Sequence, residues 1–181
     1  MYMYAADDIQ LFLNFNPADQ DSIQCALSKL SACITEIKLW MTSNMLKLND
    51  SKTEFFIATS SHNKQKLTPV HLQIGTDFIA PSDNVRNLGI IFDSQMTMSP
   101  HVTGLCKALS FQLRNISRIR RFLDTDTCNH IIRSLVLSRL DYGNALFLGI
   151  TQNNLSRLQR LQNWAGKLIF CAKNMITQHH S

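Results

Sequence analysis

The chain has little glycine and little proline, and it contains no long apolar run. With 6 Gly and 4 Pro in 181 residues, it can be neither collagen-like nor of low complexity. A membrane span needs about 18 to 20 uninterrupted apolar residues, and a secretory signal needs a basic region before an apolar one. Neither pattern is present, so we expect an intracellular protein without a membrane partner. The sequence does not distinguish nucleus from cytoplasm.

Paired cysteines and clustered metal ligands are also missing. The 5 cysteines are odd in number, widely spaced and never arranged as Cys-x-x-Cys, and the 6 histidines are equally scattered. This distribution predicts neither a disulfide framework nor a zinc site. We expect ordinary reduced thiols in the core.

Charge is present but unevenly distributed. Residues 1–99 carry 7 basic and 10 acidic side chains, whereas residues 100–181 carry 11 and 3, so the two parts have net charges of −3 and +8. A strongly basic helical segment favours a polyanionic partner, above all nucleic acid. The alternative is a solvated basic face without a ligand.

Apolar periodicity predicts a mixed α+β first part. Residues 1–13 resemble a β-hairpin with Asp7 and Asp8 at its turn. Apolar residues then recur every three or four positions up to Asn44, which predicts one long helix. Five short strands are expected after it, with a loop at residues 60–68. The expected strands cover residues 45–49, 54–58, 70–74, 78–80 and 88–92.

The second part has helical spacing throughout. Helices are expected at residues 100–122, 125–148 and 152–170, with turn signals between them. We place the boundary between the two parts near residue 98. The fold class is therefore α+β: short antiparallel strands with one long helix, followed by an all-α domain.

Five blocks, in order, resemble the reverse transcriptase of non-LTR (LINE-type) retrotransposons. The first is the acidic box, where Tyr4 to Phe12 is similar to the family's Tyr-Ala-Asp-Asp and the strand after it. Next come a helix ending in Trp40, a Leu-Asn-x-x-Lys-Thr-Glu-like block and an Asn-Leu-Gly block. The fifth block belongs to the helical region. The last three blocks are Leu46 to Glu54, Asn87 to Asp93 and Leu135 to Leu146, and Leu158 to Phe170 continues the resemblance.

The resemblance implies a palm, which carries metal-binding carboxylates, and a helical thumb. Residues 1–98 would be the C-terminal half of the palm, and residues 99–181 the basic thumb and its extension. The implied function is that of an RNA-directed DNA polymerase, a nucleotidyltransferase encoded by a transposable element. Its partners would be an RNA template, a DNA primer and, if the enzyme is active, deoxynucleotides.

In this family Asp7 and Asp8 would be catalytic and would hold Mg²⁺ or Mn²⁺, whose preferred ligands are hard oxygens. Two-metal transfer takes several converging carboxylates. The family's other metal-binding Asp and its fingers come from earlier segments that this chain does not contain, so we expect a catalytically incomplete fragment. Asp93 imitates the missing carboxylate but is assigned to structure or a turn.

The acidic box also departs from the family pattern. A second alanine separates Tyr4 from the acidic pair, so either a bulge absorbs the extra residue or Ala5 replaces the aromatic. Both alternatives remain open at the level of sequence.

Three residues outside the box complete the expected catalytic region. Lys52 would be a candidate proton donor to the leaving pyrophosphate, or else a surface lysine near Glu54. Asn87 and Gly89 would lie where the family grips the primer terminus, although Gly89 also suits a tight turn.

Two sets of cations in the helical part are expected to contact phosphates. Lys107, Arg114, Arg118 and Arg121 are separated by seven, four and three positions and share one helix face, with Arg120 beside them. Arg157, Arg160 and Lys167 form a similar stripe. The apolar residues on these helices are expected in the core: Leu105, Leu109, Leu113, Ile116, Ile131, Leu135, Leu158 and Leu161.

The sequence supports two alternatives to an enzyme fragment. One is a non-catalytic basic helical module that binds nucleic acid, for which residues 100–181 would suffice. The other is an inert product of a decayed mobile element. Salt dependence of binding discriminates between them, because phosphate contacts make affinity fall with salt.

Overall fold

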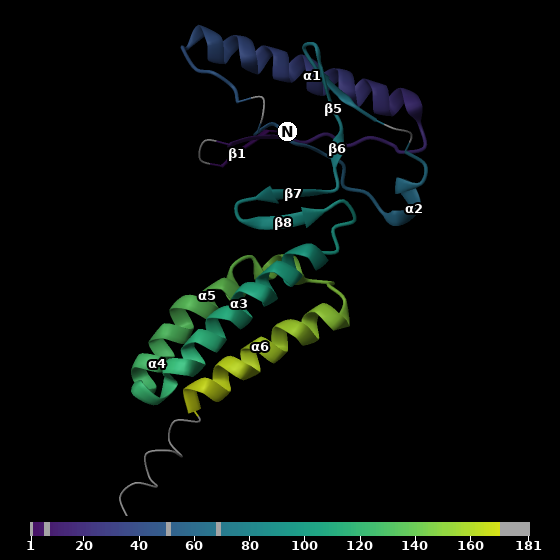
Figure 1. The fold of residues 1–181 in the computed structure, drawn as a ribbon. Helices are drawn as coiled ribbons and strands as arrows, with labels where there is room; N and C mark the ends of the chain where they lie inside the picture. The colour runs from purple at the N-terminus through teal and green to yellow at the C-terminus, as the bar shows by residue number, and fades with distance from the viewer. Residues whose placement is uncertain (1, 6–7, 50–51, 68–69, 171–181) are drawn as a thin grey trace, which may run out of the picture. The chain divides into compact units, whose positions relative to one another are not determined.

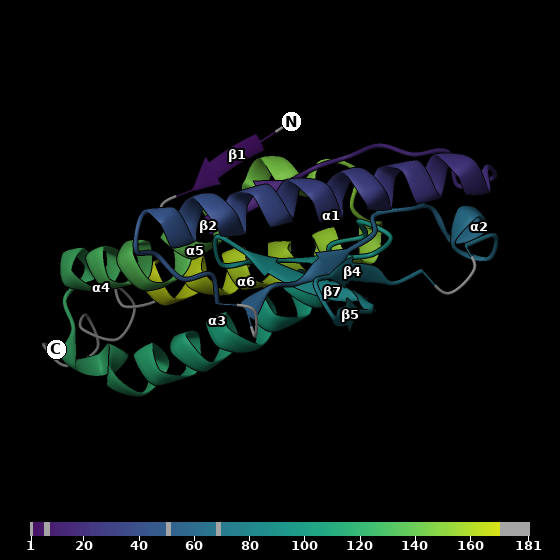
Figure 2. The same cartoon turned by 90° about the horizontal axis from the view of Figure 1, so that it is seen from above.

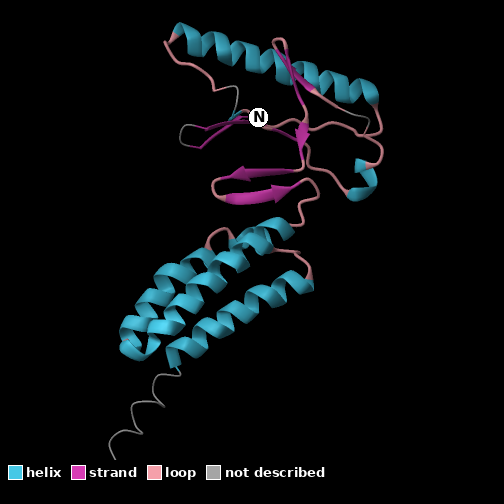
Figure 3. Ribbon diagram, viewed as in Figure 1, coloured by secondary structure: helices cyan, strands magenta, loops and turns pink. Residues whose placement is uncertain are grey.

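The computed structural model describes residues 2–5, 8–49, 52–67 and 70–170, with the backbone alone for residues 2–5 and 8. Its fold is α+β, as expected (Figures 1 and 3). The chain divides into two compact units, which we describe separately. Unit 1 comprises residues 1–89 and 93–96, and unit 2 comprises residues 90–92 and 97–181. Among the described helices, none combines the length and apolar character that crossing a membrane requires.

Unit 1 begins with the expected hairpin. Strand β1 (Tyr2–Ala5) pairs antiparallel with β2 (Asp8–Leu11), so that Tyr4 lies opposite Ile9 and Ala5 opposite Asp8. Residues 6–7, which connect the strands, lie outside the described residues. Asp8, which is expected at the turn, is the first residue of β2.

Helix α1 (Gln20–Ser43) is the long helix that the periodicity predicts. The Asp19 carboxylate caps its N-terminus by accepting a hydrogen bond from the backbone N–H of Asp21, at 3.0 Å. The apolar face of α1 packs on β4 (Leu72–Ile74), which pairs antiparallel with β5 (Asp77–Ile79) (Figure 2). The buried core of this unit consists of Ile23, Ile34, Phe55, Val70, Leu72 and Ile74.

The strand expected at residues 45–49 is absent, because those residues terminate α1. Met45 adopts a left-handed conformation (φ 58°). The N–H of Leu46 then bonds to the Met41 carbonyl (2.8 Å), and the N–H of Met45 bonds to that of Thr42 (3.1 Å). These two bonds form a Schellman motif that closes the helix.

The next segments are shorter than expected. Strand β3 (Phe55–Phe56) pairs with β6 (Pro81–Ser82), and this pair is parallel, whereas we expected only antiparallel strands. The expected loop at residues 60–68 contains a short helix, α2 (Ser61–Lys64). Its Lys64 forms a salt bridge of 2.7 Å with Asp83.

Strands β7 (Asn84–Asn87) and β8 (Ile90–Asp93) form a second hairpin, and the division between the units passes through it. Its two-residue turn has positive φ at both positions, 47° at Leu88 and 84° at Gly89. This is the geometry of a type I′ turn, which matches the twist of the paired strands. Gly89 therefore has a conformational role here.

Unit 2 is helical. It contains α3 (Ser99–Ile119), a 3₁₀ turn η2 (Arg120–Phe122), α4 (Thr125–Ile132) and α6 (Gln152–Phe170). Between α4 and α6 lie a π-helical turn η3 (Arg133–Leu137), α5 (Ser138–Asp141) and a 3₁₀ turn η4 (Asn144–Phe147). The helix expected at 125–148 thus ends at residue 141, because Gly143 turns the chain with φ 70°.

Helices α3, α4 and α6 enclose the core of unit 2. The buried residues are Leu109, Leu113, Ile116, Cys128, Ile132, Val136, Leu161 and Ala165. Leu135 was expected in this core, but 42% of it is exposed, whereas its neighbour Val136 is fully buried. The π-helical turn explains this difference, because its wider spacing places Ile132 and Val136, rather than Leu135, on the inner face.

Candidate nucleic-acid interface

The four cations predicted along α3 and the turn after it lie on the solvent-facing side. Lys107, Arg114, Arg118 and Arg121 are all exposed. The buried residues of the same helix occupy the intervening positions: Val102, Leu109, Leu113 and Ile116. Since residues three, four and seven apart share a helix face, Lys107, Arg114 and Arg118 project away from the core. We call Lys107, Arg114, Arg118 and Arg121 the α3 cation stripe.

No carboxylate neutralises this stripe from its own helix. The sequence between Ser99 and Leu123 contains no Asp or Glu, and neither does α6. Within residues 70–170, no salt bridge involves a member of the stripe. The surface therefore presents uncompensated positive charge in a form that suits an anionic ligand.

The cations of α6 divide into two kinds. Arg160 and Lys167 are exposed, but Arg157 is half-buried and contacts α3. Its Nη1 donates to Thr103 Oγ1 (3.1 Å) and to Asn154 Oδ1 (3.3 Å), and the Asn154 amide donates to Ser99 Oγ (2.9 Å). Arg157 thus joins α6 to α3, a structural role that the sequence did not predict.

Cys106 is a half-buried thiol on α3, directly before Lys107. Burial raises the pKa of this thiol, and the nearby charges of Arg157 and Arg160 oppose the rise.

Arg120, grouped with the stripe in the sequence, is almost fully buried, at 9% exposure. Its guanidinium donates three hydrogen bonds to backbone carbonyls, those of Leu168 (2.5 Å), Leu123 (2.6 Å) and Ile169 (3.1 Å). Two of these carbonyls belong to the last turn of α6, where a helix has unsatisfied acceptors. Arg120 caps α6 and is unavailable to a ligand.

Two aromatic side chains accompany the stripe, and sequence reasoning missed them. Phe111 is 56% exposed and Phe122 is 72% exposed. Phe111 lies four positions after Lys107, and Phe122 lies four after Arg118. The guanidinium carbon of Arg121 is 4.6 Å from the centre of the Phe122 ring, a cation–π contact. The sequence did contain a signal for these two rings, because each follows a cation of the stripe by four positions.

The acidic box lies in unit 1. Asp8 begins β2, and its side chain, like the whole of Asp7, lies outside the described residues. Carboxylate oxygens suit Mg²⁺, so this pair fits part of a ligand set. Among the described residues there is no group of three His, Cys, Asp or Glu side chains that could hold a metal ion. A complete two-metal site would need further carboxylates.

The Asn-Leu-Gly hairpin is attached to the acidic hairpin through side-chain amides. Gln10 Nε2 donates to Asn87 Oδ1 (2.7 Å), and Asn87 Nδ2 donates to Gln10 Oε1 (3.2 Å). Gln10 lies two residues after Asp8 on β2. The structure therefore brings two of the resembling blocks together, but it also occupies the Asn87 amide, which we had expected to be available to a primer.

The remaining predicted residues of unit 1 lie in turns. Lys52 is exposed, and its backbone N–H bonds to the Asn49 carbonyl (3.1 Å) in a turn before β3. Asp93 is the last residue of β8, and its carbonyl accepts a hydrogen bond from the Met96 N–H (2.7 Å) in the turn that follows.

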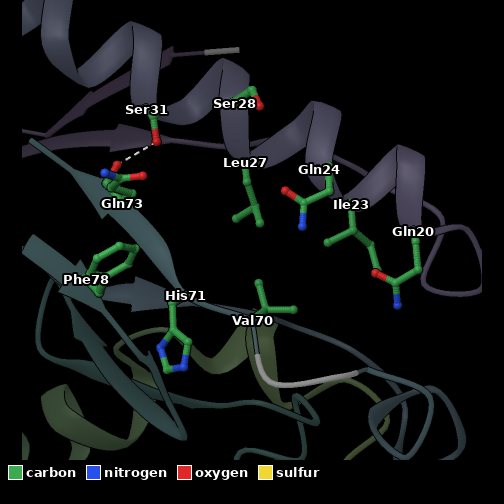
Figure 4. Close-up of a pocket in the computed structure, with 10 residues that line it drawn as sticks. All are labelled: Gln20, Ile23, Gln24, Leu27, Ser28, Ser31, Val70, His71, Gln73 and Phe78. Carbon is green, nitrogen blue, oxygen red and sulfur yellow. Dashed lines mark hydrogen bonds between the residues drawn. The ribbon is translucent and has the colours of Figure 1, made fainter.

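A groove of about 480 Å³ separates α1 from β4 and β5 (Figure 4). Its walls carry amides, hydroxyls and apolar groups, among them Gln24, Leu27 and Phe78. Ser31 Oγ donates to the Gln73 carbonyl (2.6 Å) across one end. His71 is the only titratable side chain among the described lining residues, so the groove lacks the charges that phosphate or metal chemistry requires.

No family model matches the chain, and no curated protein or solved structure matches it either.

Proposed function

We propose that this chain is the late palm and thumb of a non-LTR retrotransposon reverse transcriptase, and that unit 2 binds the phosphate backbone of nucleic acid. The observation that carries the proposal is the α3 cation stripe, exposed opposite a buried apolar face and without a carboxylate on its helix. Phosphate contacts position a nucleic acid without reading its sequence. A row of arginines and a lysine on one rigid helix is suited to that task.

The dimensions of the stripe support backbone binding. From Lys107 to Arg118 the helix rises about 16 Å, at ~1.5 Å per residue. One strand of a duplex advances about 3.4 Å per nucleotide, so the stripe spans about five phosphates. Arg160 and Lys167 are further exposed cations of unit 2, on α6.

The catalytic part of the proposal rests on the resemblance and on the pairing of Gln10 with Asn87. In it, Asp7 and Asp8 provide two carboxylates for Mg²⁺, which would supply charge neutralisation at the transferred phosphate. The Gln10–Asn87 pair fixes the strand that carries Asp8 against the Asn-Leu-Gly hairpin. Lys52 is proposed as a proton donor near this region. Polymerisation requires carboxylates beyond those of the described residues, so we propose binding as the activity of this chain alone.

A non-catalytic binding module is the second candidate. Every member of the stripe belongs to unit 2, which has its own buried core. Binding therefore does not depend on the acidic box, and a module of this kind would retain it without any metal chemistry.

The salt dependence of binding tests the proposal. Fluorescence anisotropy of the full chain with a labelled RNA–DNA hybrid should give log K falling linearly with log[salt], by about 0.7 to 0.9 per neutralised phosphate. Arg114→Gln with Arg118→Gln should lower the slope by about 1.5. The matched control is Arg133→Gln with Arg139→Gln, which removes two exposed arginines from the α4–α5 segment and should leave the slope unchanged. A salt-independent affinity would overturn the proposal.

Primer extension separates the two candidates. The enzyme candidate predicts Mg²⁺- or Mn²⁺-dependent primer extension, given the further carboxylates that two-metal transfer requires, and this extension is abolished by Asp7→Asn with Asp8→Asn. If extension survives both substitutions, the acidic box has been misassigned. If binding persists but no extension occurs, the module is the correct candidate.

A further inference from the structure

We infer that the α3 stripe is built for unpaired, single-stranded nucleic acid, whose bases stack on Phe111 and Phe122 while Lys107, Arg114, Arg118 and Arg121 hold the phosphates. This inference rests on the proposed function, because it names the form of nucleic acid that the same surface binds. It goes beyond that function because phosphate contacts alone give no preference for a single strand, whose charge density is lower than that of a duplex.

The first argument is the placement of the two rings. Lys107, Phe111, Arg114 and Arg118 follow one another at intervals of four, three and four, the repeat of a single helix face. Phe122 follows four positions after Arg118, in the 3₁₀ turn η2. The rings thus alternate with cations along the stripe. Proteins that bind single strands combine a positive track with aromatic platforms in this way.

The second argument is that both rings are open to solvent. Phe111 is 56% exposed and Phe122 is 72% exposed, although the same helix buries Leu109, Leu113 and Ile116 completely or almost completely. The contact of Phe122 with Arg121 leaves much of its surface uncovered. A solvent-exposed phenyl ring forms no hydrogen bonds with water, whereas stacking on a base removes its apolar face from water.

The third argument concerns spacing. Eight α-helical steps and three steps of the 3₁₀ turn separate Phe111 from Phe122, about 18 Å at ~1.5 Å and ~2.0 Å per residue respectively. A stacked strand covers that length with about five nucleotides at ~3.4 Å each. Two rings at this separation can therefore contact bases near the two ends of one short segment. Paired bases inside a duplex present no face to such a ring.

An anionic membrane surface is the other ligand that basic and aromatic side chains can bind. A helix that lies on a membrane has a wide apolar face with cations on the opposite side. Here the cations lie between the rings on one face, and the apolar face of α3 is buried in the core. The geometry therefore favours a strand over a lipid surface.

The test uses the full chain and a labelled 12-nucleotide DNA of mixed sequence, alone and annealed to its complement. We expect tighter binding to the single strand. Phe111→Leu with Phe122→Leu should weaken single-strand binding at least about 10-fold, because stacking is lost. It should change duplex binding less than about twofold. The salt slope should stay constant, since no phosphate contact is removed.

Three controls make the result decisive. Phe78→Leu alters an equally exposed phenylalanine, 69% exposed in unit 1, and should have no effect on binding. Phe111→Tyr with Phe122→Tyr retains both rings and should bind the single strand like the unchanged chain. Circular dichroism should show the same melting temperature for all variants, as expected for exposed positions.

The outcomes also separate this inference from the proposed function. Equal loss of single-strand and duplex affinity in the leucine variant, or no loss in either, would overturn the inference but leave salt-dependent binding intact. Absence of salt-dependent binding to both probes would overturn the proposed function itself. The third outcome concerns 70:30 phosphatidylcholine–phosphatidylserine vesicles. If the leucine variant loses binding to these vesicles but binds single-stranded DNA like the unchanged chain, the ligand of the two rings is a membrane surface, and the inference is overturned.

Discussion

The side-chain amides of Gln10 and Asn87 bind each other reciprocally across 77 residues of sequence. Each amide donates one hydrogen bond and accepts one, and both side chains are half-buried. The pair connects strand β2 to strand β7. It links the acidic hairpin directly to the Asn-Leu-Gly hairpin in unit 1.

We expect Asn87→Ala to lower the free energy of unfolding by about 1 kcal/mol, since it removes two neutral hydrogen bonds and leaves a half-buried amide without its partner. Urea denaturation measures the change. Asn84→Ala, at an exposed position of the same strand, should change it by less than about 0.5 kcal/mol. A double-mutant cycle with Gln10→Ala should give a coupling energy of about 0.5 to 1.5 kcal/mol, and additive effects would contradict the pairing.

Arg120→Lys should destabilise unit 2 by about 2 to 4 kcal/mol. A lysine ammonium cannot reproduce the planar fork that reaches three carbonyls, and the charge would stay buried with fewer acceptors. The neighbouring Arg121→Lys keeps an exposed cation and should shift the free energy of unfolding by no more than about 0.5 kcal/mol. Equal effects in the two variants, measured by urea denaturation, would show that Arg120 does not hold the end of α6.

Two glycines of unit 2 should respond to alanine in opposite directions. Gly143 has φ 70°, and a Cβ there would lie 2.6 Å from Ile90 Cδ1, so Gly143→Ala should cost about 1 to 3 kcal/mol. Gly104 lies inside α3 with open space around it, and Gly104→Ala should stabilise by about 0.5 to 1 kcal/mol. Thermal melting of both variants tests the signs. A Gly143→Ala variant that melts later than the unchanged chain would contradict the described turn.

Acid should weaken the start of α4. The Asp124 carboxylate accepts hydrogen bonds from the Thr127 N–H and hydroxyl, both at 2.8 Å, and these bonds lower the pKa of Asp124. A pKa that is lower in the folded state contributes stability above the unfolded value, and that contribution is lost as the pH falls through the folded value. The loss therefore occurs below about pH 4.

Asp124→Asn isolates this effect, because asparagine also caps helices but does not titrate. The stability of the unchanged chain relative to Asp124→Asn should be constant near pH 6 and should decline below pH 4. Asp126→Asn, one helical position into α4, serves as the matched control for the loss of one carboxylate. A difference that is independent of pH would refute the role of the charged cap.

The helices could be predicted from the sequence because their apolar residues repeat over many turns. The residues at which the helices end were harder to predict. The alternation in Met45, Leu46 and Leu48 indicates a strand by period, yet the left-handed Met45 makes this segment the end of α1. Glycine is the usual signal for such a terminus, and here methionine occupies the position, with 96% of its surface exposed. At residues 45–49, helix capping and tertiary packing outweighed the strand-like alternation of the sequence.

The candidate site was predictable only as a pattern of charge. Spacing placed Lys107, Arg114 and Arg118 on one exposed face, which the structure confirms. The same spacing separates Arg121 from Arg120, because Arg120 lies four positions after Ile116 and seven after Leu113, on the buried face of α3. Spacing could not show that the Arg120 guanidinium reaches the end of α6, since that contact depends on tertiary packing. The contact of Arg157 with Thr103 was equally hidden, since it depends on how α6 lies against α3.

The cap that Arg120 places on α6 means that the end of one helix is encoded 48 residues earlier in another. Helices α3 and α6 therefore cannot be exchanged independently between related proteins. A recombinant that takes α6 from one sequence and α3 from another keeps a proper terminus only if the donor of α3 carries an arginine at this place. In a set of related sequences, this arginine and the length of α6 should vary together.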